Sequence, residues 1–394
     1  MANMVDYVAW RGDFGFAISP WCAIDALLMA TLSYLNFYGI GDDRGWTLSE
    51  AARIDLLQTE ESQTFPNRKR MFQAMAESKR FADCRMHHFI ALTDEAREMQ
   101  FSAMCIDLPD ETLCVAFRGT DNTIIGWKED FNMAYRTLVP GQEAAIHYLK
   151  QVAAVTERPL RLTGHSKGGN LAVYAAASVP DELQDRILEI HSFDGPGMND
   201  EMAASRGYER IRGKIRSYIP QGSIIGLLMH YYEPYTVVHS TATGINQHDP
   251  MTWEVYGPRF EEAGKLDSSA TVVCETLHDW LKTSTADQRG AFVDTLFRYV
   301  ETTRATRMSD LTGEKWKSLM TMVGNRKELD VEARRVFNRL MAQAITLGFG
   351  NVVEHGRNRA FAQRRPLAAE TESREKDAGK GDELHGGKDD ELQA

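Results

Sequence analysis

The alternation of apolar and polar positions predicts that the middle of the chain switches repeatedly between strands and helices. Six short apolar runs have the length and period of strands, and two stretches between them are rich in helix-forming residues. The expected strands lie near 87–92, 99–107, 112–118, 158–163, 187–193 and 214–219, and the expected helices near 141–154 and 168–178. Strands that alternate with helices favour an α/β fold with a mainly parallel sheet.

Helical periodicity dominates on both sides of this core, which we assign to residues 81–265. Residues 1–80 are expected to form a helical N-terminal segment packed on the core, and residues 266–365 a helical C-terminal region. The apolar positions expected to line helix faces in the C-terminal region are Phe292, Leu296, Phe297 and Val300, and then Val336, Phe337, Leu340, Met341 and Ala344. This region is either a lid or partner surface or, as we favour, a cap that completes the core. Residues 366–394 contain almost no large apolar residues, so a disordered acidic tail is expected there.

The longest apolar stretch runs from Trp21 to Ile40 and contains one acid, Asp25. Its leucine and isoleucine residues recur at helical spacing. We therefore expect an amphipathic helix of the core rather than a membrane span.

A nucleophile elbow is predicted around Ser166. The apolar strand 158–163 leads into the turn, and the helix-forming residues 171–177 follow it. Such a turn forces the serine into a strained backbone conformation, and only very small residues fit two positions to either side of it. Gly164 and Gly168 occupy those two positions. The turn lifts the hydroxyl clear of the sheet and places the next backbone N–H at a helix N-terminus, where an oxyanion is stabilised.

A second motif lies upstream of the elbow. The apolar run 112–117 ends in R-G-T at 118–120, and Trp127 and Asp130 follow in a W-x-x-D spacing. The string V-A-F-R-G-T…W-x-x-D-F ahead of G-H-S-x-G-G resembles the class 3 lipases, serine esterases of the α/β-hydrolase fold. The resemblance covers about residues 85–255.

This resemblance implies an α/β-hydrolase fold and an oxyanion hole with two donors. One would come from Thr120, and the other from the backbone N–H of Lys167, the residue after the serine. The opening segments 6–13 and 25–35 are also similar to a bacterial branch of lipase-like proteins known as Mbeg-like.

The catalytic acid is predicted to be Asp194. In α/β-hydrolases the triad follows the chain order serine, acid, histidine, and Asp194 ends the strand 187–193 at the functional edge of the sheet. The alternative is an Asp that only initiates the Asp-Gly-Pro turn. Class 3 lipases usually take the acid from the following strand, where this chain has Ser223. Either Asp194 replaces that acid from one strand earlier, or the triad is incomplete.

Among the 11 histidines, we predict that His248 is the catalytic base. It lies in a late loop ahead of Trp253, as the base of class 3 lipases does. His239, expected within a strand, and His230, in an apolar run, are the alternatives, and both are better explained as packed or hydrogen-bonded residues.

Two features depart from the lipase pattern. Class 3 lipases commonly carry an apolar residue where this chain has Lys167, and a lysine at the positive end of a helix is electrostatically unfavourable. We expect it either to serve an anionic substrate or to point to solvent. The region where those lipases carry their lid, 121–127, offers only Ile124, Ile125 and Trp127 as apolar contacts. Weak adsorption to lipid surfaces is therefore expected.

The composition and net charge of the chain indicate which partners and which cellular compartment to expect. A net charge of −11 over 394 residues disfavours nucleic acid and gives no general attraction to anionic membranes. The N-terminus lacks the apolar core of a signal peptide, and no transmembrane segment is predicted. The five cysteines show no paired spacing, which suits a reducing compartment. We therefore expect a cytoplasmic protein. No metal-ligand cluster or phosphate-binding glycine loop is visible, so no cofactor is expected. The oligomeric state is left open.

Two classes of function remain. The first is a serine hydrolase that cleaves carboxylic esters, of lipids or of small acyl compounds, through an acyl-enzyme. The second is a catalytically impaired lipase-like fold that binds a ligand or partner, which Ser223 and Lys167 would favour. The sequence does not select the acyl substrate, because hydrolase pockets are built from loops.

Overall fold

A computed structural model describes residues 2–37, 44–54, 66–121, 123–133 and 135–305. Within them, eight strands form one sheet in the order β1 to β8, and two short strands form a separate hairpin. The strands of the sheet are β1 Trp46–Thr47, β2 Arg85–Asp94, β3 Met99–Asp107, β4 Leu113–Phe117, β5 Leu160–His165, β6 Ile187–Phe193, β7 Ile215–Pro220 and β8 Tyr235–Val238; the hairpin is β9 Val255–Tyr256 with β10 Arg259–Phe260. All six strands predicted from the apolar pattern are present at nearly the predicted positions.

The sheet changes from antiparallel to parallel at β4. The neighbours from β1 to β4 pair antiparallel, whereas the four pairs from β4 to β8 are parallel. Helices connect the successive strands from β4 to β7, since a parallel pair needs a long crossover. The prediction of an α/β fold with a mainly parallel sheet is confirmed.

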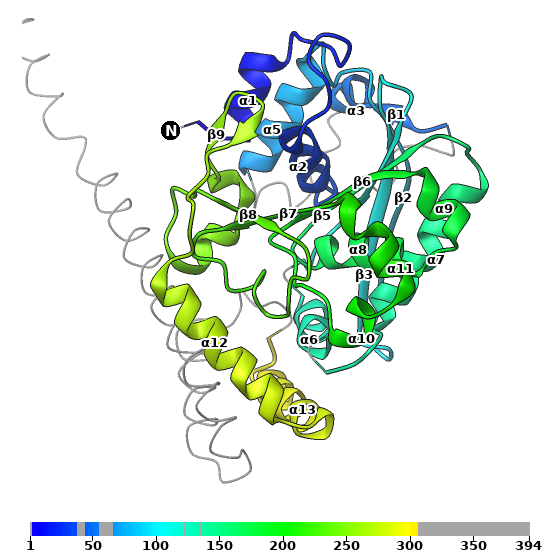
Figure 1. The fold of residues 1–394 in the computed structure, drawn as a ribbon. Coiled ribbons are helices and arrows are strands. Elements are labelled where there is room, and N and C mark those ends of the chain that lie inside the picture. Colours follow the sequence, from blue (N-terminus) through cyan, green and yellow to red (C-terminus); the bar gives the residue numbers. More distant parts are fainter. Residues whose placement is uncertain (1, 38–43, 55–65, 122, 134, 306–394) are drawn as a thin grey trace, which may run out of the picture. The chain divides into compact units, whose positions relative to one another are not determined.

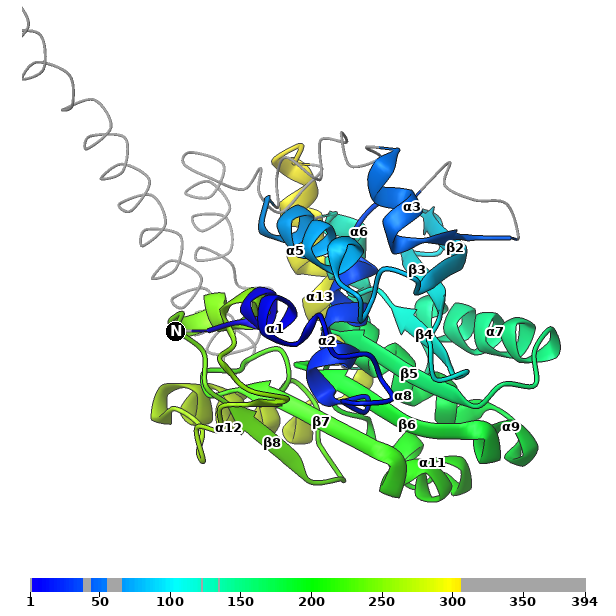
Figure 2. The same ribbon diagram turned by 90° about the horizontal axis from the view of Figure 1, so that it is seen from above.

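Helices cover both faces of the sheet. The chain-ordered helices are α1 Met4–Arg11, α2 Ala23–Leu32, α3 Leu48–Arg53, α5 Pro66–Glu77, α6 Ile124–Asn132, α7 Pro140–Ala154, α8 Lys167–Ser178, α9 Asp181–Arg186, α10 Asp200–Ala203, α11 Arg206–Ile211, α12 Ser268–Thr283 and α13 Ala286–Thr302. Figure 1 shows α1, α2 and α5 above strands β5 to β8, with α8 and α11 below them. In Figure 2, which looks down on the first of these faces, α2 crosses in front of the strands.

Alternate side chains of β4 belong to the two hydrophobic cores on opposite faces of the sheet. Cys114 and Ala116 belong to the core that contains α2, while Leu113, Val115 and Phe117 belong to the core that contains α7 and α8. A strand buried on both faces has to be apolar at every position, because successive side chains point to opposite faces. This explains why β4 reads as one continuous apolar run.

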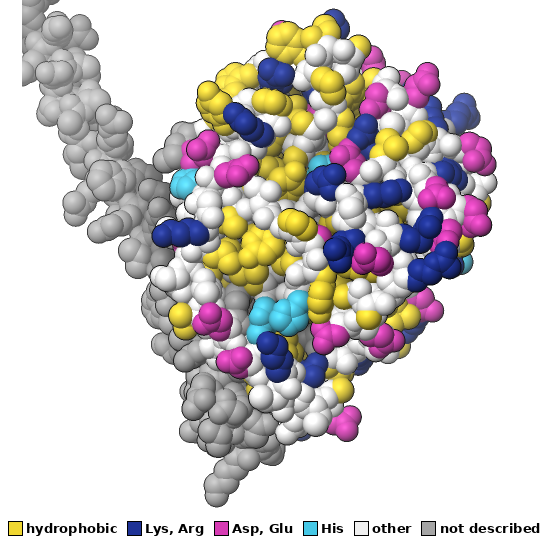
Figure 3. All heavy atoms as spheres, in the orientation of Figure 1, with side chains coloured by type: hydrophobic (Ala, Val, Ile, Leu, Met, Phe, Trp, Pro, Cys, Tyr) yellow, Lys and Arg dark blue, Asp and Glu magenta, His cyan; other side chains and the backbone are white. Residues whose placement is uncertain are grey.

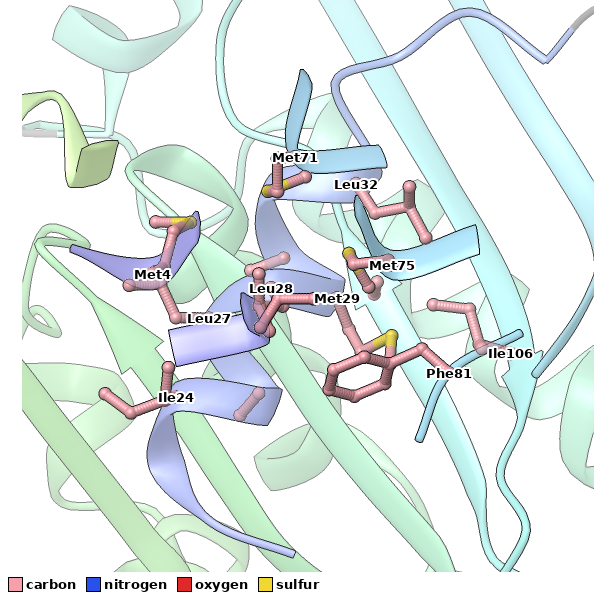
Figure 4. Packing of buried hydrophobic residues seen from close by; sticks show 14 of the residues in the cluster. Met4, Ile24, Leu27, Leu28, Met29, Leu32, Met71, Met75, Phe81 and Ile106 are labelled. Atoms are coloured by element: carbon pink, nitrogen blue, oxygen red, sulfur yellow. The ribbon is translucent and has the colours of Figure 1, made fainter. Parts of the chain in front are cut away.

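The N-terminal helices bury more of α2 than the sequence indicated. Every residue from Ile24 to Leu32 is buried, because α1 and α5 pack over the side that faces away from the sheet (Figure 4). The predicted helix of the core is therefore present, but it is buried on every side rather than amphipathic. Asp25 tolerates this burial because Arg80 forms a two-pronged ion pair with it, Nε to Oδ1 at 2.9 Å and Nη2 to Oδ2 at 2.5 Å.

Helices α12 and α13 form a helical pair beside α6. Phe292, Phe297 and Val300 are buried between them, as the sequence predicted, and Ile124 and Trp127 of α6 pack against the same cluster. Of the described helices, none is long and apolar enough to cross a membrane. The predicted helix faces beyond residue 305 and the predicted tail 366–394 lie outside the described residues.

Candidate active site

The chain makes a sharp turn at Ser166, between the end of β5 and the start of α8. Ser166 has φ +58° and ψ −133°, a strained conformation for a residue with a side chain. Its N–H donates to the carbonyl of Phe193 in β6 at 2.9 Å, and its carbonyl accepts from Gly169 N–H at 2.9 Å. The sheet and the helix together hold the strained residue in place, as the elbow motif predicted.

The two predicted glycines of the elbow lie in direct contact with backbone. A Cβ atom on Gly164 would come under 3.0 Å from the carbonyl of Gly168, and a Cβ on Gly168 would come under 3.0 Å from the carbonyl of Phe117. Backbone cannot swing aside as the end of a side chain can. Glycine is therefore required at both positions for β4, β5 and α8 to approach this closely.

Gly168→Ala should destabilise the fold by more than about 1–3 kcal/mol, the usual range for overpacking a core, since the added methyl meets the β4 backbone. Thermal unfolding measures this directly. Gly213→Ala is the matched control, because a Cβ there meets nothing within 4 Å. Equal melting temperatures for the two variants would show that the elbow can open to admit a side chain.

Asp194 follows β6 directly and is completely buried. Its Oδ2 lies 2.6 Å from Nδ1 of His248. Its Oδ1 accepts from the hydroxyl of Ser223 and from the N–H of Gly226 at 3.2 Å. The two residues predicted as acid and base are thus brought together, and Ser223 donates to the acid.

His248 ends a short 3₁₀ helix, Gly244–His248, whose position is fixed by several contacts. Trp253 Nε1 donates to the carbonyl of Gln247 at 2.7 Å. The carbonyl of His248 lies 2.8 Å from Nε2 of His165, and the two imidazole rings are 4.6 Å apart between centroids. His248 is therefore tied to the residue that precedes Ser166. Ser166 Oγ makes no hydrogen bond to His248 among the described residues.

His165 is a neutral structural link in this arrangement. Burial holds the pKa of its imidazole well below the usual value, so Nε2–H donates to His248 and Nδ1 accepts from the hydroxyl of Tyr34 at 2.9 Å. Tyr34 belongs to the N-terminal segment, which thereby supports the loop that carries His248. No pattern in the sequence indicated this role of Tyr34.

The two alternative histidines have other partners. His239 lies just after β8 rather than within it, and it forms an ion pair with Glu254. His230 packs against His278, with 4.3 Å between the ring centroids. Of these three histidines, His248 is the one that contacts Asp194.

The loop of Thr120 passes beside the elbow. A Cβ on Gly119 would lie 3.0 Å from Cβ of Ser166, and the hydroxyl of Thr120 donates to Oδ2 of Asp130 at 2.5 Å. Lys167 is the first residue of α8, where backbone N–H groups have no partner within the helix. The positions predicted for the two oxyanion donors therefore flank Ser166 in the fold.

The side chain of Lys167 contradicts both sequence-based interpretations. It is buried, and its Nζ lies 2.9 Å from Oε2 of Glu129, so it neither points to solvent nor is available to an anionic substrate. Reasoning from sequence missed Glu129. The only signal was a second acid next to Asp130, which local spacing does not connect with a lysine 38 positions away.

Comparison with solved structures finds similarity to several lipases. The chain is similar to a structure of M37 lipase, with 18% identity over 51% of this chain and 69% of that one and a TM-score of 0.32. It is also similar to a triacylglycerol lipase from Penicillium expansum, with 14% identity over 58% and 81% and a TM-score of 0.32. An MDLA variant from Penicillium cyclopium has 13% identity over 60% and 84% and a TM-score of 0.34. A comparison with curated proteins finds no match.

A family model settles the relationship that the opening segments suggested. The Mbeg1-like model matches residues 75–298, more than half of the chain, and the match includes β3 to β8, the elbow, Asp194 and His248. The chain belongs to the Mbeg1-like family.

Proposed function

We propose that this protein is a serine hydrolase that cleaves carboxylic esters, of lipids or of small acyl compounds, through an acyl-enzyme. The observation that carries the proposal is the 2.6 Å contact between Asp194 and His248, in a chain whose strained Ser166 follows β5 in the order that α/β-hydrolases use. Four described cysteines are free thiols, which suits a reducing compartment such as the cytoplasm.

Each of these residues has a separate role in the proposed reaction. Ser166 Oγ attacks the ester carbonyl while His248 Nε2 takes the hydroxyl proton, and Asp194 stabilises the imidazolium through Nδ1–H. The N–H of Lys167 and a donor from Thr120 stabilise the oxyanion. The protonated His248 then gives its proton to the departing alkoxide, which leaves as the alcohol. Water, deprotonated by His248, then attacks the acyl-Ser166 ester. His248 returns this proton to Ser166 Oγ as the acyl bond breaks, which releases the acid and restores both residues.

Labelling with a fluorophosphonate probe tests the proposal without knowledge of the substrate. The probe phosphonylates a serine only when a base activates it, so the folded wild-type protein should react at Ser166, and the adduct should be found on the peptide that contains it. A folded protein that fails to react at Ser166 would refute the proposal.

The second candidate is a lipase-like protein that binds its ligand without turning it over. The absence of a hydrogen bond between Ser166 Oγ and His248 among the described residues favours it. In many serine hydrolases, however, this contact tightens only when substrate is bound. Saturable binding of an acyl ester together with unlabelled Ser166 would favour this second function.

Ester hydrolysis should show no abrupt rise in rate when the substrate passes from solution into micelles. Ile124 and Trp127, which lie where related lipases carry a lid, already pack against the α12 and α13 cluster, so little apolar area is left to adsorb to an interface. On the face in Figure 3, basic and acidic side chains are interspersed, which gives that face no continuous charge of one sign. Rates for a short-chain ester on both sides of its aggregation threshold check this expectation.

The contrary result would be a steep rise at the threshold. If Ile124→Ser with Ile125→Ser abolished that rise while hydrolysis of dissolved ester stayed unchanged, α6 would be an interfacial lid.

A further inference from the structure

The ammonium group of Lys167 lies in a buried polar cluster behind the elbow. Its Nζ donates to the backbone carbonyl of Gln100 at 2.7 Å, to the Gln100 side-chain oxygen at 2.9 Å and to Oε2 of Glu129 at 2.9 Å. The Lys167 and Glu129 side chains are both fully buried. Three acceptors use all three protons of the ammonium. The lysine is thus fixed in one place.

Two consecutive acids of α6 face this lysine. Glu129 also accepts from the N–H of Gly141 at 2.6 Å and from the N–H of Gln100 at 3.1 Å. Asp130 Oδ1 lies 4.0 Å from Nζ of Lys167, and its Oδ2 accepts from Thr120. Glu129 is fully buried and Asp130 is 15% exposed. Two acids this close repel each other unless a cation lies nearby, and Lys167 is the cation that pairs with both.

We propose that Lys167 is a positioning residue for the reaction: its side chain holds the acids of α6, and through Asp130 and Thr120 it fixes the oxyanion loop against the elbow. The inference rests on the proposed function, because the cluster is proposed to position the oxyanion donors of that same ester hydrolysis. Lys167 then positions both oxyanion donors. It supplies its own backbone N–H directly, and it holds the donor of Thr120 in place through Asp130.

The protonation of Asp130 links this cluster to pH. Burial raises the pKa of Asp130 to about 6, against the lowering effects of Lys167, the Thr120 hydroxyl and His248, while Glu129 raises it further. Asp130 also adds to the high pKa of the Tyr34 phenol. Below that pKa Asp130 becomes neutral and its hold on Thr120 weakens. Without Lys167, Asp130 should take up its proton at higher pH.

Lys167→Met removes the charge while it leaves the backbone N–H in place. We expect kcat to fall about ten- to a hundredfold with KM little changed, because loosely held oxyanion donors and misplacements near 1 Å cost this much. The acid limb of the pH–rate profile should move to higher pH. In the double variant Lys167→Met with Glu129→Gln, the limb should lie between wild type and the single variant, since the effect of Lys167 on Asp130 is larger than that of Glu129.

The double variant also protects the test against misfolding, because it does not leave Glu129 as a buried charge without its lysine. Lys150→Met, on the exposed side of α7, is the matched control and should behave as wild type. A folded Lys167→Met or double variant with wild-type kcat and an unmoved acid limb would overturn the proposal, as would a variant that loses only melting temperature.

A titration of ¹³C-labelled aspartate, with the Asp130 signal assigned by its loss in Asp130→Asn, separates this inference from the proposed function. Lys167→Met should raise the pKa of Asp130 whether or not the wild-type protein labels with fluorophosphonate. An unlabelled wild type together with this rise would refute the hydrolase alone, while an unchanged Asp130 pKa would refute the role of Lys167.

Discussion

Ser166→Ala and His248→Ala should each lower ester turnover by about 10⁴-fold or more, because triad members act as a unit and the loss of one removes most of their joint effect. Ser166→Ala removes the proposed nucleophile outright. His248→Ala removes the group that accepts its proton. Both variants should also lose fluorophosphonate labelling.

Folding should survive His248→Ala. The contact from His165 reaches the backbone carbonyl of His248, and the Trp253 contact goes to Gln247, so neither needs the imidazole. His239→Ala is the matched control, since it removes a histidine of the neighbouring loop whose partner is Glu254, and it should keep wild-type turnover. Full activity in His248→Ala would instead move the base to His239 or to another site.

The parts of this site that the sequence predicted are those set by local geometry. The elbow needs a strand, small residues two positions from Ser166 and a helix, and all of these lie within about twenty residues. Asp194 could be found because it ends a strand at the sheet edge where parallel strands present their functional groups. The resemblance to class 3 lipases, whose base lies in a late loop, then favoured His248 as the predicted base.

The remaining features depend on contacts between distant segments. The burial of α2 on all sides requires α1 and α5 to pack over it, and the role of Tyr34 requires it to meet a histidine 131 positions later. The interpretation of the Lys167 side chain was wrong for the same reason, because its partner comes from a distant segment. A lysine at a helix N-terminus looks unfavourable when only the helix is considered, and its partner on α6 becomes visible only in the folded chain.

The position of the acid is the other departure from the class 3 pattern, and Asp194→Asn tests it. An asparagine cannot hold Nδ1–H of His248 as a carboxylate does, so the imidazole loses the orientation and tautomer needed to take the proton of Ser166. By analogy with other triads, turnover should fall by about 10⁴-fold. Asp194 has φ +46°, a conformation that asparagine adopts more readily than most residues, so the backbone turn should be kept.

Two further variants decide whether Asp194 is the acid or only a turn residue. Ser223→Ala removes one donor to the carboxylate but leaves its contact with His248, so its loss should be far smaller than that of Asp194→Asn. Asp194→Asn with Ser223→Asp places a carboxylate at the position where class 3 lipases usually have their acid, beside the position that Asp194 Oδ1 occupies. This double variant should recover part of the lost turnover. If Asp194→Asn lowered the melting temperature but kept wild-type turnover per folded molecule, Asp194 would serve the turn alone, and His248 would work without a carboxylate partner.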